Sequence, residues 1–201
     1  LLTKVDLYGN PIEAIDVSNL KDLTYLDVSS LDEGKLTDLN VGNNPKLTEL
    51  RCYNNKLASL DLSHCPELTK VDAKNNEIAD INLNSNLKLQ YVNLNNNKLT
   101  AIDVTRLTSL TDLLLGGNKL TNIDVSKNTS LYDLTLWSNK LTQLDLTKNK
   151  TLQTLSFQNN NIHTLDLSTN TDLRQINCGG NGMSACDLDE FFWTLPTYPN
   201  I

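Results

Sequence analysis

Residues 131–151 read LYDLTLWSNKLTQLDLTKNKT, and residues 152–172 repeat the same pattern as LQTLSFQNNNIHTLDLSTNTD. In both stretches apolar residues occupy positions 1, 4, 6, 11, 14 and 16 of a 21-residue unit, and asparagine occupies positions 9 and 19. Self-similarity at a short fixed period indicates a solenoid, in which each unit is one rung stacked on its neighbours. The unit begins at Leu2, Leu23, Leu47, Leu68, Leu89, Leu110, Leu131, Leu152 and Leu173.

The spacing within one unit predicts the local structure of a rung. Positions 4 and 6 alternate with polar positions 3, 5 and 7, which is the period-2 pattern of a strand, and positions 14 and 16 alternate in the same way. No segment between them has helical spacing. We therefore predict a repeat solenoid with a parallel β-sheet on its concave face, a second short extended segment in each repeat, and little helix.

The two asparagine rows are predicted to satisfy backbone groups where the chain turns inward, because an amide offers two donors and an acceptor. Leu20, Cys65 and Leu107 replace asparagine at position 19, so those turns are expected to differ locally. One step between units is 24 residues instead of 21, and the extra residues lie within 30–35, where Leu31 stands at the usual asparagine position.

Composition excludes several classes of protein. The 201 residues carry a net charge of −7, which disfavours nucleic acid as a partner. No stretch approaches the ~18 apolar residues of a membrane span, and the start shows no signal-peptide pattern. Because repeat material begins at Leu2 without a polar cap, we expect a longer protein whose signal or lipoprotein sequence has been removed.

The unit LxxLxLxxNxLxxLDLSxNxx resembles the short bacterial leucine-rich repeat of the internalin J type. That type often carries a cysteine ladder at position 6, which here only Cys52 and Cys178 match. The resemblance implies a leucine-rich-repeat fold and a surface-exposed bacterial protein, and some members of the family mediate adhesion. It adds little about the ligand, because one fold hosts many functions.

Residues 184–196 resemble a cap found in repeat proteins of gut Bacteroidetes. Their spacing predicts a short helix that seals the last rung and ends at Pro196, with Asp187 and Glu190 as its N-terminal capping pair. The chain is thus expected to divide into a solenoid of nine repeats at 2–183 and a helical cap and tail at 184–201. One helical face is expected to carry Leu188, Phe191, Phe192 and Leu195.

Little in the sequence points to catalysis, a metal or a cofactor. Cys52, Cys178 and Cys186 fall at inward apolar positions and Cys65 at an inward turn, so we expect buried thiols rather than zinc ligands, although a disulfide remains open. His64 and His163 are far apart and are expected to be solvated. We therefore predict a protein that is not an enzyme.

Other regular rows have a structural interpretation. The charges of the acids at position 15 are expected to be offset by lysines at position 18, and their oxygens to accept hydrogen bonds from hydroxyls at position 17, with calcium as the alternative. The lysines at position 10 are expected to form a solvated edge. The sequons at Asn128 and Asn149 fall on the inward asparagine row, so glycosylation there is not expected.

The outward positions of the predicted strands remain for function, and large side chains gather there. Tyrosine, tryptophan and arginine are typical of binding hot spots, so we predict recognition of a protein ligand by a secreted or surface-displayed module. A glycan ligand, or a purely structural spacer in which the aromatic residues stiffen the sheet, are the alternatives; the oligomeric state is undetermined. The candidate ligand-binding residues are Tyr25, Arg51, Tyr53, Lys74, Tyr91, Asp112, Leu114, Tyr132, Asp133 and Trp137, with Tyr8 beside the first of them.

Overall fold

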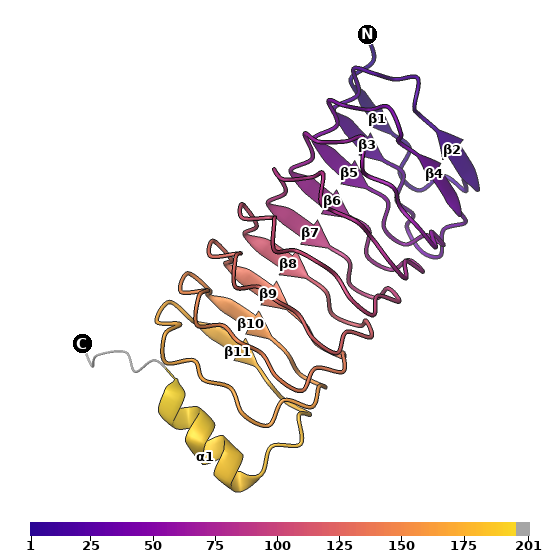
Figure 1. Ribbon diagram of the computed structural model, residues 1–201. Helices are drawn as coiled ribbons and strands as arrows, with labels where there is room; N and C mark the ends of the chain where they lie inside the picture. Colours follow the sequence, from indigo (N-terminus) through magenta and orange to yellow (C-terminus); the bar gives the residue numbers. More distant parts are fainter. Residues whose placement is uncertain (196–201) are drawn as a thin grey trace.

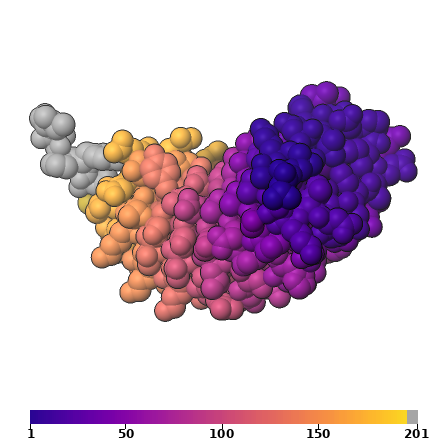
Figure 2. Space-filling view, turned by 90° about the horizontal axis from the view of Figure 1, so that it is seen from above, coloured from indigo at the N-terminus to yellow at the C-terminus, as the bar shows by residue number. Residues whose placement is uncertain are grey.

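The computed structural model describes residues 1–195 and shows a single stack of parallel strands closed at one end by a helix (Figure 1). Seen from above, the rungs follow one another in chain order along an elongated, bent body (Figure 2). The predicted helix stop at Pro196 and the tail to residue 201 lie outside the described residues. The main sheet contains β1 (Lys4–Asp6), β3 (Tyr25–Asp27), β5 (Glu49–Arg51), β6 (Lys70–Asp72), β7 (Tyr91–Asn93), β8 (Asp112–Leu114), β9 (Asp133–Thr135), β10 (Thr154–Ser156) and β11 (Gln175–Asn177).

Each of these nine strands covers positions 3–5 of the repeat unit, and each pairs in parallel with the strand of the next unit. Leu113, for example, aligns with Leu134, which aligns with Leu155. These position-4 side chains are fully buried, whereas most side chains at positions 3 and 5 are at least partly exposed. A slip of one residue would exchange the two sets, so the buried row fixes the register. The predicted solenoid and its parallel sheet are confirmed.

A second, two-stranded sheet joins β2 (Ala14–Asp16) to β4 (Asp38–Asn40) on the other side of the first two rungs (Figure 1). In later repeats the corresponding segment keeps its alternation, with Val104 and Leu146 buried, but belongs to no sheet within residues 1–195. The inner and outer apolar rows meet in one continuous core that runs the length of the stack. Leucine dominates this core, as the low aromatic content requires.

The asparagine row at position 9 ties each rung to the one before it. The Asn139 Nδ2 donates to the Leu136 carbonyl of its own rung at 3.0 Å and to the Leu115 carbonyl of the preceding rung at 2.9 Å. Its Oδ1 accepts the N–H of Leu120 at 2.9 Å. Asn76, Asn97, Asn118 and Asn160 repeat this pattern. The predicted role of this row is confirmed, and it links rungs as well as closing turns.

The asparagine row at position 19 makes a simpler set of hydrogen bonds. The Asn149 Nδ2 donates to the carbonyls of Val125 and Asn128 in the preceding rung, and both carbonyls also accept a backbone N–H. Leu107 stands at this position in the fifth rung and keeps the same backbone turn, with its N–H 3.0 Å from the Val104 carbonyl. The prediction of locally different turns is therefore wrong for the backbone. The reason is that the turn closes through main-chain bonds, and the side chain only adds to them.

The acids at position 15 close the turns on that side. The Asp145 Oδ1 accepts the backbone N–H and the hydroxyl of Thr147, at 2.9 and 2.7 Å. Asn82 accepts the N–H of Asn84 in the same way, so a carboxylate and an amide serve equally. The hydrogen bonds expected from the hydroxyls at position 17 are present at Asp103 and Asp145, and the backbone N–H is the recurring donor.

These turns predict a specific acid sensitivity. Hydrogen bonds from Thr147 lower the pKa of Asp145, and Asp103, Asp124 and Asp166 are lowered by their own position-17 residues. A folded-state pKa below the unfolded value of about 3.9 contributes stability above that pH, and this contribution is lost as the pH falls through the folded pKa. Replacing these four aspartates by asparagine should flatten the dependence of the unfolding free energy on pH below about pH 4, measured by urea denaturation. An unchanged slope would contradict this assignment.

The three extra residues of the second unit form a loop that packs against the third rung. The Gly34 N–H donates to the Asn54 carbonyl at 2.9 Å, and a Cβ on Gly34 would overlap the Asn55 Oδ1. Leu36 then resumes the buried row at position 11. The insertion therefore leaves Leu31 exposed while the core period continues beneath it.

Helix α1 (Ala185–Thr194) covers the last rung (Figure 1). The predicted capping pair is wrong: Ser184 is the N-cap, and its capping box is completed by Asp187 at the third helical position, not by Asp187 and Glu190. With the helix starting at Ala185, Phe191 lies in the core and Leu188 and Leu195 are half-buried. Phe192 is 60% exposed, so the prediction that it shares the face of Phe191 is wrong. Within residues 1–195, no helix is long and apolar enough to span a membrane.

The cysteines follow the prediction only in the regular rungs. Cys52 and Cys65 are buried, and the Cys65 Sγ donates to the Val41 carbonyl, in the place of the missing asparagine. Burial raises the pKa of Cys65 to about 11, as expected of an unreactive thiol. Cys178 is only partly buried, and Cys186 is exposed on α1. The prediction for Cys186 is wrong because the helix replaces the rung in which position 14 would point inward.

Candidate functional site

The candidate residues lie on the exposed face of the nine-stranded sheet, in two groups that meet where β7 pairs with β8. Tyr25, Arg51, Tyr53, Lys74 and Tyr91 lie among β1 to β7, and we call them, with their charged partners, the N-terminal network. The C-terminal patch consists of Tyr132, Asp112, Leu114, Asp133 and Trp137 on or beside β8 and β9. The two groups differ in how many of their side chains already have a charged or aromatic partner within the chain.

In the N-terminal network, Tyr25 is enclosed by cations. The Lys4 Nζ lies 4.5 Å from the centre of its ring, and the Arg51 guanidinium lies 5.6 Å from it. Its hydroxyl donates to Asp27 at 3.3 Å. Burial, followed by the charge of Asp27, raises the pKa of Tyr25. This tyrosine is therefore held in place by its own chain.

Acidic partners complete the same network. The Arg51 Nε lies 2.7 Å from a Glu49 oxygen, and the Lys70 Nζ lies 3.3 Å from the same oxygen. Burial opposes ionisation of Glu49, but these two cations outweigh it and lower its pKa. The sequence hypothesis missed Glu49, Lys70 and Lys4, although each stands at the same outward position 3 as Tyr25.

The remaining tyrosines of the network are also covered by lysines. The Lys74 Nζ lies 5.0 Å from the centre of the Tyr53 ring, which is itself in tilted contact with Tyr8 at 6.3 Å. The Lys70 Nζ lies 5.1 Å from the Tyr91 ring. The aromatic side chains of this network thus contact side chains of neighbouring rungs. This agrees with the alternative in which they stiffen the sheet.

The C-terminal patch is organised around Trp137, which is half-buried. A Cβ built on Gly116 would overlap the Trp137 indole, so this ring lies directly over the backbone of the preceding rung. The absence of a side chain at Gly116 therefore leaves the space that the indole fills. Leu114 is half-buried at position 5, and Tyr132 is 49% exposed at position 2.

Asp112 and Asp133 lie side by side at position 3 of β8 and β9. Asp112 accepts the Thr111 hydroxyl at 2.6 Å, and Asp133 accepts the Thr135 hydroxyl at 3.3 Å. Burial raises the pKa of Asp133, and the charge of Asp112 adds to this effect. Trp137 stands four residues further along the chain than Asp133, beyond the end of β9. The patch therefore extends from position 2 to position 7 of the rung.

The raised pKa of Asp133 has a consequence for stability. A folded-state pKa above the unfolded value means that ionisation at neutral pH costs stability, and this cost disappears once the pH falls below about 4. Asp133→Asn should therefore raise the Tm at pH 7 by roughly 1–3 °C and leave it unchanged near pH 3. Asp145→Asn, at a turn, is the control without such a gain. A lower Tm for Asp133→Asn at pH 7 would contradict the assignment.

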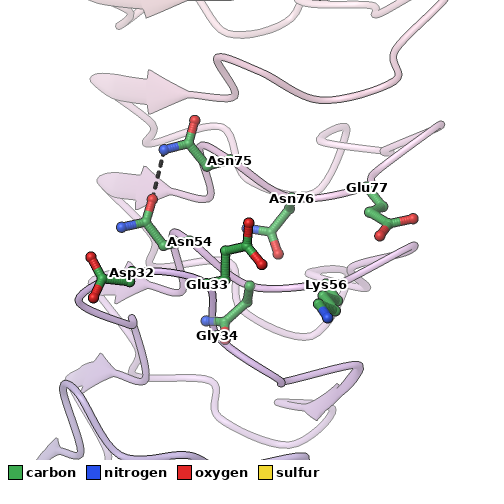
Figure 3. A pocket seen from close by; sticks show the side chains of 9 residues that line it. Asp32, Glu33, Gly34, Asn54, Lys56, Asn75, Asn76 and Glu77 are labelled. Atoms are coloured by element: carbon green, nitrogen blue, oxygen red, sulfur yellow. Dashed lines mark hydrogen bonds between the residues drawn. The ribbon is translucent and has the colours of Figure 1, made fainter.

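A groove of about 510 Å³ lies at the edge of the sheet, and it contains none of the predicted residues. Figure 3 shows it between the inserted loop, which carries Asp32 and Glu33, and the amides of Asn54 and Asn75, joined by a 2.6 Å hydrogen bond. In the sequence, the only indication of this groove is the 24-residue spacing between the repeat starts Leu23 and Leu47. Within residues 1–195, no group of three or more histidine, cysteine, aspartate or glutamate side chains is placed to hold a metal ion.

Comparison with known proteins shows which solved structures share this fold. No protein-family model matches the sequence, and no curated protein matches it. The functional domain of InlJ from Listeria monocytogenes, which includes a cysteine ladder, matches with a TM-score of 0.72 and 32% identity over 90% of this chain and 44% of that one. A leucine-rich-repeat protein of Leptospira interrogans matches with a TM-score of 0.83 and 28% identity over 98% and 55% of the two chains.

The chain thus spans about half the length of these two structures. Internalin C2 of Listeria monocytogenes has a TM-score of 0.78 at 22% identity, over 88% of this chain and 80% of that one, and supports the fold alone. In place of a full cysteine ladder, position 6 here has Cys52 and Cys178 with other buried apolar residues between them. The chain is a leucine-rich-repeat protein with a repeat similar to that of the internalins.

Proposed function

We propose that this chain is a non-enzymatic recognition module that binds a protein ligand through the exposed face of its nine-stranded sheet. The observation that carries the proposal is the C-terminal patch. Tyr132 is 49% exposed, and Leu114 and Trp137 are half-buried apolar side chains at outward positions, where the repeat does not require them. Exposed apolar and aromatic groups next to charged ones are typical of protein-binding surfaces.

The similarity to internalins supports the same proposal at a coarser level, because they share this solenoid and its exposed sheet. We further propose that the parent protein is bacterial and displayed at the cell surface or secreted. The first ~30 residues of the parent gene test this localisation. A secretory or lipoprotein signal would support it, and an uninterrupted cytosolic start would contradict it.

Binding is tested with a variant that changes the patch without opening the core. Leu114→Ser combined with Tyr132→Ala removes two outward side chains, whereas Asn122→Ala combined with Gln143→Ala changes a groove formed by neighbouring outer segments. On an array of candidate host proteins and glycans, a protein captured by the wild type should be captured at least tenfold less well by the first variant. The second variant should bind normally.

Three outcomes overturn the proposal. Capture that is equal for both variants would place the site elsewhere. Capture of glycans alone would make the chain a glycan-binding module. No capture at all, with lower stability when the aromatic residues of the sheet face are replaced, would indicate a structural spacer.

A further inference from the structure

Asp112 and Asp133 form a like-charged pair on the sheet face, in register on adjacent parallel strands. Like charges on directly neighbouring strands destabilise a sheet. Both side chains are also half-buried, so solvent screens them less than it would screen exposed groups. Nothing in the packing of the repeat requires an acid at position 3, which elsewhere holds Thr154 or Gln175.

The N-terminal network shows how the same face accommodates acids and rings elsewhere. Glu49 is held between Arg51 and Lys70, at 2.7 and 3.3 Å. Lys70 also lies over Tyr91, so a single cation serves an acid on one side and a ring on the other. In these rungs the chain supplies its own cations.

The aspartate pair lacks such a cation. Across the described residues, no lysine, arginine or histidine nitrogen lies within the 4.0 Å of an ion pair from either carboxylate. In the last four rungs the outward positions 3, 5 and 7 contain only these two charged residues. Tyr91 flanks the pair on β7 and Leu114 lies beside it on β8, so an acid pair, a ring and an aliphatic surface are adjacent.

We propose that this face of β8 and β9 docks a partner protein through an arginine whose guanidinium lies between Asp112 and Asp133. The planar fork of arginine can donate to both carboxylates, and its aliphatic stem suits the surface of Leu114. The arginine would neutralise these acids as Lys70 neutralises Glu49, with the cation supplied from outside the chain. Partial burial raises the pKa of Asp133, which agrees with a carboxylate that lacks a counter-charge. This inference rests on the proposed function and names the chemistry of the partner.

The direct test uses acetyl-Gly-Arg-Gly-amide as the probe, followed by NMR chemical shifts of the 201-residue chain at low salt. The peptide should shift the amides of β8 and β9 in a saturable way, and the same peptide with citrulline, a neutral arginine analogue, should not. Asp112→Asn combined with Asp133→Asn should weaken the shifts at least tenfold. Asp124→Asn combined with Asp145→Asn removes the same charge at turns and should leave them unchanged.

Several results would overturn the inference. The citrulline peptide could bind as well as the arginine peptide, the Asp112/Asp133 variant could bind the probe normally, or the control variant could lose it equally. If a captured protein is lost by the Leu114/Tyr132 variant but retained by the Asp112/Asp133 variant, the arginine site fails while the proposed function stands. Saturable binding of the probe without capture of any protein would show that the arginine site exists but that the proposed protein-binding function fails.

Discussion

Replacing Asn139 by leucine is expected to lower the free energy of unfolding by about 3 kcal/mol, because the change leaves a buried N–H without its acceptor and removes two short hydrogen bonds. The Asn139 Oδ1 accepts the Leu120 N–H at 2.9 Å, while its Nδ2 joins the carbonyls of Leu115 and Leu136. These bonds connect the seventh rung to the sixth, to which Leu115 and Leu120 belong, and Asn160 joins the eighth rung to the seventh in the same way. The loss should appear in urea denaturation at pH 7.

Asn149→Leu is the matched control, in the other asparagine row of the same rung. Both carbonyls that Asn149 reaches keep a backbone donor without it, and Leu107 occupies the equivalent position naturally. Its cost should be about 1 kcal/mol, the net value of an ordinary hydrogen bond. Equal losses for the two variants would show that the rows are interchangeable, contrary to their hydrogen-bond patterns.

Gly116→Ala is the second change with a large expected effect. A Cβ at this position overlaps the Trp137 indole, so the ring must leave the rung, at a cost of about 2 kcal/mol, typical of overpacking. The chain contains two tryptophans, and Trp193 is 89% exposed. In a Trp193→Phe background, the fluorescence of Trp137 should shift to longer wavelength as the indole becomes solvated.

Gly179→Ala is the control for this prediction. Gly179 stands at the same position 7 in the ninth rung, and no atom lies within 4 Å of a Cβ built there. Its substitution should leave both stability and Trp137 fluorescence nearly unchanged. If Gly116→Ala behaves like Gly179→Ala, the Trp137 indole is not held against the preceding rung.

Much of the candidate surface could be predicted from the period alone. Because side chains alternate along a strand, the outward position of Tyr25, Asp112 and Leu114 follows from their place in the 21-residue unit. Their partners could not be predicted in this way. Arg51 contacts both Tyr25 and Glu49, and the choice among such neighbours depends on rotamers and on residues more than 20 positions away in the sequence.

The 21-residue period predicts the solenoid and the role of the asparagines at position 9, because these depend on a pattern that every rung repeats. The three-dimensional structure was needed wherever that pattern is interrupted or leaves a choice. It showed that Ser184 starts the cap, that Cys186 faces solvent, and that the inserted loop borders a groove. It also divided the sheet face into a network that satisfies its own charges and a patch where Asp112 and Asp133 remain without a cation within residues 1–195. That division arises from contacts between rungs, which no single repeat encodes.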